Sequence, residues 1–434
     1  LGSVDIARNQ PFQKNRRYLF ERSKETLGLL YADHYPYRQK ATARGVRRAP
    51  FHALFKERGA VMSEVAGWER PGWFATPGQA PEYDYAWGRT RWFANVAREH
   101  RAIREGVGLY DMTSFGKIRV EGPDAMRFLN HVCGNDVDVA TGRIVYTQFL
   151  NRSGGIEADV TVTRLAETAY LVVTPSATLA ADQAWLRRHL GEWRVVLTDM
   201  TAAEGVLAVM GPKARALLGD VSPDDFDAPF GSAFEIEIGM GLARAHRVSY
   251  VGELGWEIYV SSDIAMHVAE VLLEAGEAHG LKLCGAHAMD SCRIEKAFRH
   301  FGHDITSEDH VLEAGLGFAV KTGKSEFIGR DAVLAKRDAG VDKRLVQFRL
   351  KEPEPMLYHN EPILRDGEVV GYLTSGAYGH YLGAAIGLGY VPCSGESAAE
   401  VLSSRYQIDV AGTRVEAEAS LKPLYDPQAR RVRA

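Results

Sequence analysis

The sequence has few cysteines, and their positions exclude a disulfide scaffold or a zinc-thiolate site. The four in 434 residues are Cys133, Cys284, Cys292 and Cys393, and no two of them form a Cys-x-x-Cys pair. This usage is typical of a protein in a reducing compartment and gives no pattern of metal ligands. We therefore expect no metal site and a cytoplasmic location, or the mitochondrial matrix if the source is eukaryotic.

Long apolar runs and an excess of charge of one sign are also lacking. No run approaches the roughly 18 residues that a membrane span needs, and no signal-peptide pattern opens the sequence. The 52 basic and 56 acidic residues give a formal net charge of -4. Because the chain has no bulk positive field, we expect neither nucleic acid nor a membrane as a partner.

Fingerprints of nucleotide cofactors and of common hydrolases are missing as well. Gly323-Lys324-Ser325 lacks the upstream glycine of a phosphate-binding loop. No GxGxxG motif joins a strand to a helix, and neither HExxH nor GxSxG occurs. We therefore expect no flavin or nicotinamide site within this chain.

The pattern that is present predicts an α+β protein with several antiparallel sheets. At 434 residues, two to four domains are expected. Residues 1–80 have helical spacing over Tyr18–Tyr31 and then a segment, Trp68–Phe74, that we expect to be a surface loop pinned by two tryptophans. Residues 81–340 mix strands and helices. Residues 341–434 are mostly short alternating strands, typical of a small antiparallel β-barrel or sandwich.

One predicted strand carries two carboxylates. Residues 151–155 have the composition of a turn, and the strand that follows places Glu157 and Asp159 on the face opposite Ala158 and Val160. Aspartate is uncommon in strands, so its presence needs a reason. A solvated outer face is the commoner reason. The alternative is a face that points into a cleft and supplies a proton acceptor or an anchor for a ligand rich in donors.

Two further segments carry polar side chains in regular spacing. A predicted hairpin joins strand Ala243–Val251 to strand Trp256–Val260 and puts Glu257 on its polar face. A predicted helix over Ala286–Arg299 aligns Asp290 with Arg293. We expect Glu257 to be exposed on an edge hairpin and the Asp290–Arg293 pair to be an exposed ion pair, unless either belongs to a site.

Several motifs in a fixed order together resemble the aminomethyltransferase (glycine cleavage T-protein) family. The motifs are Tyr110–Ile118, Tyr146–Asp159, Tyr250–Glu257, Leu316–Phe318, Phe327–Arg330 and Thr374–Gly376. The chain is most similar to the C-terminal, folate-binding half of dimethylglycine and sarcosine dehydrogenases. Residues 1–75 resemble the end of the middle domain that joins the flavin half of those enzymes to their folate half.

The resemblance implies a three-domain cloverleaf around a folate pocket, with a C-terminal antiparallel β-barrel. The implied domains are 1–80, the end of a flavoenzyme middle domain with a linker; 81–340, the folate-binding domain; and 341–434, the barrel. The family's catalytic aspartate falls on Asp159. Ala158 stands where the family has a further aspartate, which puts a mechanism with two aspartates in doubt.

The resemblance also implies the residues that bind the folate. Tyr146 and Tyr250 match tyrosines that line the pterin pocket, and Glu257 matches the glutamate that pairs with the pterin NH donors. Arg293 takes the place of a helical arginine that holds the folate tail, because Met289 stands where that arginine would be. Pro175 replaces an asparagine of the family.

The implied function is tetrahydrofolate-dependent one-carbon transfer. An iminium or formaldehyde unit from an N-methyl amine of the dimethylglycine or sarcosine type would be captured as 5,10-methylenetetrahydrofolate. FAD would lie in an upstream domain or a partner subunit, and the first residue, Leu1, fits a piece of a longer polypeptide. The alternatives are a stand-alone folate-dependent methyltransferase or demethylase, a T-protein that works with a lipoyl carrier, and a folate-binding or structural module without catalysis.

Overall fold

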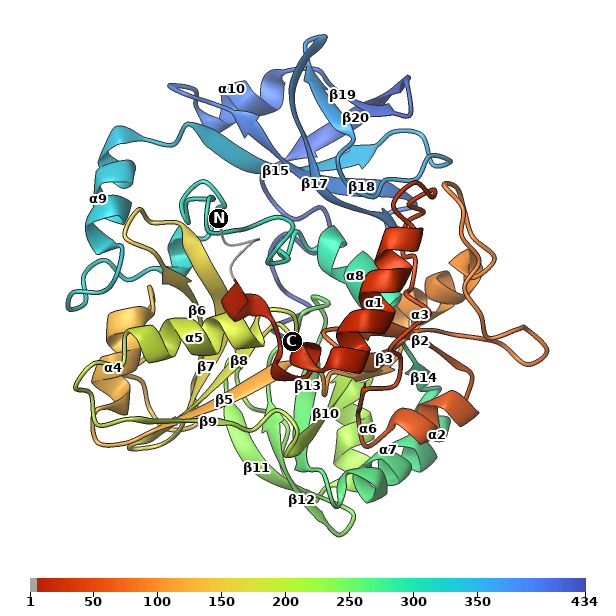
Figure 1. Cartoon of the computed structure of the whole chain (residues 1–434), viewed down its shortest axis with the longest axis vertical. Helices are drawn as coiled ribbons and strands as arrows, with labels where there is room; N and C mark the ends of the chain where they lie inside the picture. The colour runs from red at the N-terminus through yellow and green to blue at the C-terminus, as the bar shows by residue number, and fades with distance from the viewer. Residues whose placement is uncertain (1–5) are drawn as a thin grey trace.

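In the computed structural model, residues 6–434 are described and form four β-sheets with flanking helices (Figure 1). The N-terminal part contains two 3-10 turns (Ile6–Arg8 and Pro11–Lys14), α1 (Arg16–Gly28), β1 (Arg47–Arg48), α2 (His52–Glu57), β2 (Ala60–Val65) and β3 (Trp68–Phe74). Asn15 caps α1, since its side chain accepts hydrogen bonds from two N–H groups of the first turn. The helix predicted from Tyr18 therefore begins at Arg16.

The expectation of a surface loop over Trp68–Phe74 is wrong. These residues form β3, the middle strand of the sheet β1-β3-β2, and Trp68 and Trp73 are 4% and 1% exposed. Pro71 fits within the strand because the pairing with β2 shifts register beside it, between Val61 and Met62. A bulge accommodates the missing proline N–H, which a regular ladder would require as a donor.

A five-stranded antiparallel sheet forms what we call the five-stranded lobe (residues 116–199). Its strands run in the order β6-β7-β8-β5-β9. Their bounds are β5 (Gly116–Glu121), β6 (Ile144–Leu150), β7 (Ile156–Ala166), β8 (Ala169–Thr174) and β9 (Val196–Asp199), with α4 (Ala125–Val132) and α5 (Leu179–Arg188) between them. Alternate residues of β7 pack with Phe128 and Leu129 of α4 in one buried cluster. This packing holds β7 with its polar residues on the other face.

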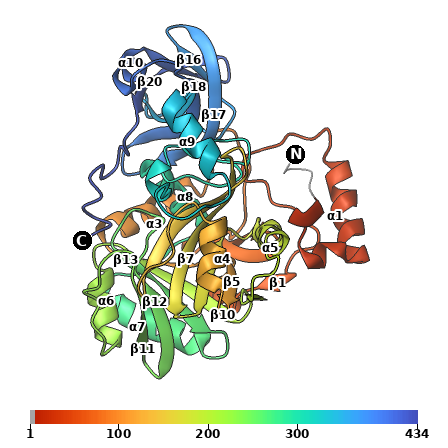
Figure 2. The ribbon, with the colours of Figure 1, turned by 90° about the vertical axis from the view of Figure 1, so that its left-hand side faces the viewer.

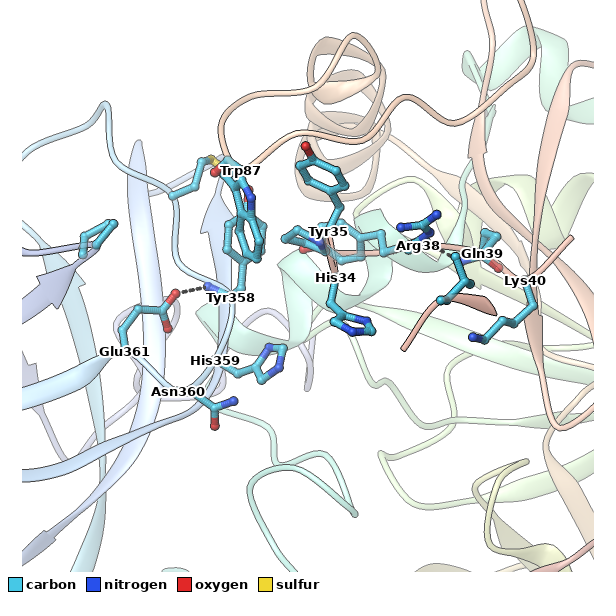
Figure 3. Close-up of a pocket in the computed structure, with 16 residues that line it drawn as sticks. His34, Tyr35, Arg38, Gln39, Lys40, Trp87, Tyr358, His359, Asn360 and Glu361 are labelled. Carbon is cyan, nitrogen blue, oxygen red and sulfur yellow. Dashed lines mark hydrogen bonds between the residues drawn. The ribbon is translucent and has the colours of Figure 1, made fainter. Parts of the chain in front are cut away.

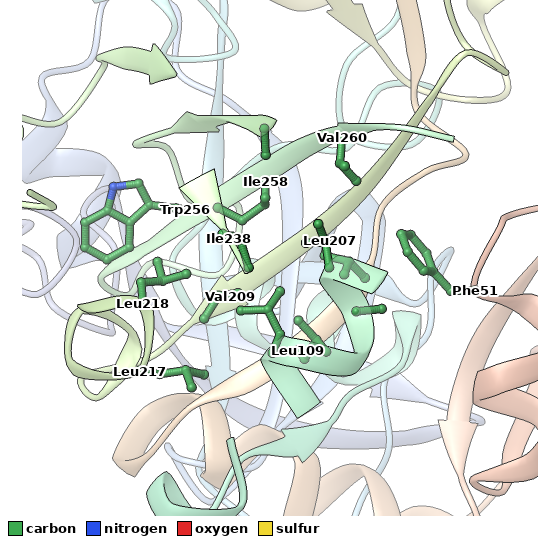
Figure 4. Packing of buried hydrophobic residues seen from close by; sticks show 14 of the residues in the cluster. Phe51, Leu109, Leu207, Val209, Leu217, Leu218, Ile238, Trp256, Ile258 and Val260 are labelled. Carbon is green, nitrogen blue, oxygen red and sulfur yellow. The ribbon is translucent and has the colours of Figure 1, made fainter. Parts of the chain in front are cut away.

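A six-stranded sheet forms what we call the six-stranded lobe. Its strands come from both sides of the five-stranded lobe in the sequence, which is therefore an insertion. The strand order of the six-stranded lobe is β11-β12-β13-β10-β4-β14. The elements are α3 (Phe93–Glu105), β4 (Gly108–Asp111), β10 (Glu204–Met210), α6 (Ala214–Val221), β11 (Ala233–Ile238), β12 (Gly241–His246), β13 (Gly255–Ser261), α7 (Ala265–His279), β14 (Lys282–Leu283) and α8 (Ala286–Glu295). Strand β4 pairs with β10 although the whole five-stranded lobe lies between them in the chain. The core of this lobe is apolar (Figure 4).

Two predicted elements of this lobe end earlier than expected. Strand β12 ends at His246, so residues 247–254 form a long hairpin loop rather than the end of a strand. Helix α8 ends at Glu295, and Ala297 has a φ of 53°, which a helix does not tolerate. Arg299, which was predicted to be the last residue of this helix, therefore lies in the loop that follows it.

The predicted C-terminal barrel is confirmed as a closed barrel of six antiparallel strands. Its order is β15-β18-β17-β16-β19-β20. The bounds of its strands are β15 (Lys343–Leu350), β16 (Pro362–Arg365), β17 (Glu368–Gly379), β18 (Ala384–Pro392), β19 (Tyr406–Val410) and β20 (Thr413–Ser420). Helix α9 (Arg330–Ala339) precedes the barrel in the sequence, and α10 (Ala398–Ser403) lies between β18 and β19. In Figure 1 the barrel lies above the two lobes, and α8 lies below it.

The C-terminal segment (residues 421–434) leaves the barrel and returns to the six-stranded lobe, as Figure 2 shows. The Tyr425 hydroxyl donates a hydrogen bond to Glu253, and Lys296 forms an ion pair of 2.8 Å with Asp426. Arg431 donates to the backbone oxygen of Arg104 at 2.9 Å. The segment therefore holds the barrel against the lobe. In residues 6–434 no helix is both long enough and apolar enough to cross a membrane.

Candidate functional site

The hairpin β6–β7 positions Asp159. The Asn151 side chain closes the turn by accepting from the N–H groups of Ser153 and Gly155, and Gly154 takes a φ of 80°. Beyond the turn, Gln148 of β6 lies directly opposite Asp159 of β7. The alternation predicted for β7 is observed, and it turns Asp159 away from the apolar core. Asp159 is nevertheless only partly exposed.

The carboxylate of Asp159 has no cationic partner within ion-pair distance among residues 6–434. Gln148 Nε2 donates a hydrogen bond to its Oδ1 at 2.8 Å. Burial raises the pKa of Asp159 to about 6, and this rise is reduced by Gln148, by the Tyr146 hydroxyl and by the positive charge of Arg299. The side chain is therefore deep enough to be desolvated and still retains accessible surface, which is the expected state of a group that lines a recess.

The two predicted tyrosines each stand against a phenylalanine. Tyr146 stacks on Phe318, with ring centroids 6.1 Å apart and an angle of 26°. Tyr250 stacks on Phe298 at 6.2 Å and 18°, and its hydroxyl donates to the backbone oxygen of Arg299 at 3.0 Å. Burial raises the pKa of both hydroxyls, and the charge of Asp159 adds to the rise in each case. Electrostatically, the structure thus brings Asp159 together with both tyrosines.

Glu257 lies on β13 in the six-stranded lobe. The Tyr259 hydroxyl donates to Glu257 Oε2 at 2.8 Å. Burial raises the pKa of Glu257 to about 7, while Tyr259 and the charge of Lys117 oppose the rise. Like Asp159, Glu257 is partly exposed rather than fully solvated. The expectation of a merely exposed carboxylate on an edge hairpin is wrong, because β13 lies between β12 and β10 in the middle of its sheet.

Arg293 of α8 is held by protein partners. It forms ion pairs of 2.7 Å with Asp290 and with Asp304, and its Nη1 donates to Ser375 Oγ at 3.2 Å. The predicted Asp290–Arg293 pair is present, but the expectation that it is exposed is wrong, because the Arg293 side chain is 2% exposed. No observation tests whether Arg293 also contacts a ligand, so that assignment stays a prediction.

Three polar side chains near Glu257 or one another, Lys117, Asp111 and Arg70, were not predicted from the sequence as site residues. Lys117 is fully buried and donates to the backbone oxygens of Thr113 and Phe115, and burial lowers its pKa to about 8. Asp111 and Arg70 are partly buried. The sequence did give an indication for Lys117, because a cation within a predicted strand of apolar residues is unusual. No comparable signal marked Asp111 or Arg70, since both are common residues at strand ends or in loops.

A separate cavity of about 700 Å³ lies between residues 29–40 and the loops of the barrel (Figure 3). It is lined by aromatic and basic side chains, including Tyr35, Trp87, Tyr358, His34 and Lys40. None of the five predicted site residues lines it. Tyr37 lines this cavity, and the centroid of its ring lies 4.7 Å from that of His287 on α8, so the cavity approaches the N-terminal part of α8. Among the described residues, no cluster of His, Cys, Asp or Glu is placed to hold a metal ion.

Three family descriptions match the sequence. The GCVT N-terminal domain matches residues 51–324, and the glycine cleavage T-protein C-terminal barrel domain matches residues 343–426. The FAD dependent oxidoreductase central domain matches residues 1–49. The first two matches span the lobes and barrel described above, and the third spans the segment that precedes the lobes.

Known proteins resemble the whole chain. The 4-methylaminobutanoate oxidase (formaldehyde-forming) of Paenarthrobacter nicotinovorans is 44% identical, over 100% of this chain and 52% of that protein. Human mitochondrial sarcosine dehydrogenase is 33% identical, over 96% of this chain and 50% of that protein. The chain thus spans about half the length of these two relatives.

A crystal structure confirms the predicted fold. The glycine cleavage system aminomethyltransferase T from Bartonella henselae superposes with a TM-score of 0.76 at 26% identity. The match covers 88% of this chain and 99% of that structure. The part of the sequence outside the match is small enough that the two lobes and the barrel have their counterparts there.

Proposed function

The chain belongs to the glycine cleavage T-protein (aminomethyltransferase) family, and from this premise we propose that it performs tetrahydrofolate-dependent one-carbon transfer at Asp159. The proposed product is 5,10-methylenetetrahydrofolate, formed with a one-carbon unit from an N-methyl amine. One observation carries the proposal: Asp159 is a deep, partly accessible carboxylate with a raised pKa and no ion-pair partner among residues 6–434. Such a group destabilises the fold, and proteins keep such groups mainly at functional sites.

The surrounding side chains suit a reduced pterin. A pterin presents an edge of N–H donors, and the Glu257 carboxylate offers two acceptor oxygens, one of which is already oriented by Tyr259. The flat ring needs aromatic walls, and the faces of Tyr146 and Tyr250 are each stiffened by a phenylalanine behind them. Bound tetrahydrofolate supplies the nitrogen nucleophiles that accept the carbon.

The role proposed for Asp159 is electrostatic and acid–base. Gln148 fixes one carboxylate oxygen by its hydrogen bond. With a pKa near 6, Asp159 is ionised at neutral pH and can stabilise a cationic carbon that approaches it. It can then accept a proton from a nitrogen that becomes bonded to that carbon. The hydrogen bond from Gln148, then that from Tyr146, and last the charge of Arg299 oppose the rise in the pKa of Asp159 and favour its ionised form.

The one-carbon unit is proposed to come from a flavin enzyme. The match of residues 1–49 to an FAD dependent oxidoreductase central domain supports an FAD-dependent domain or subunit as the partner. The names of the two relatives, a 4-methylaminobutanoate oxidase and a sarcosine dehydrogenase, support an N-methyl amino acid as the amine. We assign 1–80 to the junction with that partner, 81–340 to folate binding and 341–434 to the barrel.

Asp159→Asn and Asp159→Ala test the proposal. Tetrahydrofolate is mixed with formaldehyde and sarcosine, and formation of 5,10-methylenetetrahydrofolate is followed above the enzyme-free background. Loss of an acid–base group lowers the enzymatic rate by about 10²–10⁴-fold, while tetrahydrofolate binding by fluorescence should change little. The rate for the native protein should rise with pH around an apparent pKa near 6, and the Asn variant should lose this dependence.

Asp338→Asn is the matched control, because Asp338 lies on α9 with a side chain that is 76% exposed. It should leave rate and binding unchanged. A rate enhancement that survives intact in Asp159→Asn would refute the assignment of Asp159. A native protein that binds no tetrahydrofolate would refute the whole proposal.

A further inference from the structure

Arg70 places a guanidinium in the interior from the N-terminal sheet. It lies on β3 opposite Ser63 of β2, and β3 packs against α8. The approach of the two elements is close, since a Cβ added at Gly285 before α8 would lie 2.2 Å from the backbone oxygen of Gly72. Arg70 is therefore held near His287 and Asp290 of α8. Burial and, to a smaller extent, the charge of Arg70 lower the pKa of His287, and the charge of Asp290 opposes the lowering by burial of the pKa of Arg70.

The Arg70 guanidinium makes no hydrogen bond and no ion pair with any residue in the described range 6–434. Its Nε is buried without a partner. Burial lowers the pKa of Arg70 even though several acidic groups lie in its surroundings. An unpaired charge that is partly removed from water costs stability, and the cost grows with the degree of burial.

Two other deep arginines of this region form ion pairs with carboxylates. Arg104 forms ion pairs with Glu253 at 3.3 Å and with Glu295 at 2.9 Å. Arg293 likewise pairs with two aspartates at 2.7 Å each. Arg247, which is 1% exposed, has no carboxylate partner but donates to the backbone oxygens of Gly255 and Ala434. Unlike these three arginines, Arg70 has neither a carboxylate nor a carbonyl partner among the described residues, and a ligand would supply one.

Asp111 is an acidic residue near Arg70 that also lacks an ion-pair partner among the described residues. Asp111, at the end of β4, accepts a hydrogen bond at Oδ1 from the N–H of Thr113 at 2.9 Å and has no ion pair with a described residue. Burial raises its pKa to about 6, and the rise is reduced first by the hydrogen bonds from Thr113 and then by the charges of Lys117 and Arg70. Both Asp111 and Arg70 keep some accessible surface. The interior therefore offers one cation and one anion to a ligand that carries both charges.

We propose that Arg70 binds the carboxylate of a zwitterionic amino acid at this site and that Asp111 receives its amino group. The proposal rests on the proposed function, and it adds the two residues that hold the N-methyl amino acid at this site. A folate tail, with its extra carboxylate, fits less well beside Asp111 and Asp290.

Arg70→Gln, Asp111→Asn and the control Arg119→Gln test this site. Arg119 is 42% exposed on β5 and pairs only with Glu121 at the surface. Calorimetric titrations compare sarcosine with dimethylamine, which has the same amine and no carboxylate. Loss of a charge-assisted hydrogen-bonded pair weakens binding by about 10–100-fold. We expect Arg70→Gln to lose this much sarcosine affinity and no dimethylamine affinity, and Arg119→Gln to lose neither.

Stability gives an independent readout. Because Arg70→Gln removes an unpaired, partly buried charge, the melting temperature of the ligand-free protein should rise slightly, whereas loss of a structural arginine would lower it. Arg119→Gln should leave it unchanged. A higher melting temperature combined with lost sarcosine affinity supports a binding residue, and a lower melting temperature with general loss of ligands overturns it.

Titrations with tetrahydrofolate and with a tetrahydropterin that lacks the glutamate tail separate the two sources of a carboxylate. If Arg70→Gln weakens only tetrahydrofolate, the guanidinium binds the folate tail and the amino-acid assignment is overturned. Unchanged sarcosine affinity in Arg70→Gln also overturns it. Failure of the proposed function is distinguishable, because it appears as absent tetrahydrofolate binding in the native protein.

Discussion

At the scale of single residues, the molecule buries carboxylates that have no ion-pair partners. Asp159 and Glu257 lie on different lobes, each with one hydrogen-bond donor at close range and a raised pKa. Alternation along the strands was sufficient to predict which face of the strand each carboxylate occupies. It could not predict that these faces turn inward, because that depends on how two separately formed sheets approach each other.

Glu257→Gln should raise the stability of the ligand-free protein at neutral and higher pH. The native pKa of about 7 lies above the ordinary value of 4.5, so the folded state binds more protons between these values and stability falls as pH rises through them. The variant lacks this loss, and its advantage should grow from about pH 4.5 to pH 7 and reach about 1–3 kcal/mol. Urea unfolding at pH 4, 6 and 8 measures it.

The same variant should bind tetrahydrofolate more weakly, by about 10–100-fold, because a neutral amide replaces a charged acceptor. Glu418→Gln serves as its control, since Glu418 is 47% exposed on the barrel and pairs with the exposed Arg349. Equal stability of Glu257→Gln and the native protein at every pH would contradict the burial of an ionised carboxylate at this position.

At the scale of elements, α8 is the joint between the six-stranded lobe and the barrel. Arg293 reaches from α8 to Asp304 in the following loop and to Ser375 on β17. Asp304 also accepts from the hydroxyls of Ser375 and Thr374. The spacing of Asp290 and Arg293 predicted that they pair. Helical periodicity could not predict that Arg293 is buried, because the barrel strand that helps to cover it, β17, is distant in the sequence.

Arg293→Met should destabilise the protein by about 3–5 kcal/mol, because it leaves the carboxylate of Asp304 buried without its cation. Asp304 is 0% exposed, so water cannot replace the guanidinium. Urea unfolding of Arg293→Met, Asp304→Asn and the double variant measures the coupling, and the double variant should recover part of the loss. A change below about 1 kcal/mol for Arg293→Met would show that Arg293 is not structural.

At the scale of the whole molecule, the C-terminal segment holds the barrel to the six-stranded lobe. The barrel itself could be predicted from its short alternating strands, whereas the contacts of residues 421–434 could not. The Tyr425–Glu253 and Arg431–Arg104 contacts join positions 172 and 327 residues apart, and no local pattern encodes such pairs. The domain limits at residues 80 and 340 stay predictions.

Asp426→Asn should loosen this attachment. Asp426 pairs with Lys296, whose side chain is 3% exposed, and loss of the charge leaves that cation with the backbone oxygen of residue 426 as its partner. Asparagine tolerates the φ of 43° at this position, so the backbone is preserved. We expect a loss of about 1–3 kcal/mol and faster proteolysis after residue 420, measured against Glu418→Gln. Unchanged proteolysis would contradict a holding role.

The insertion of the five-stranded lobe between β4 and β10 sets an order in time. About 90 residues separate the end of β4 from the start of β10, and at about 5–20 residues per second the ribosome needs roughly 5–20 s to make them. By the end of this interval all five strands of the inserted lobe have been made, whereas β4 still has no neighbouring strand. The sheet that carries Asp159 can therefore form before the strand that carries Glu257 has been synthesised.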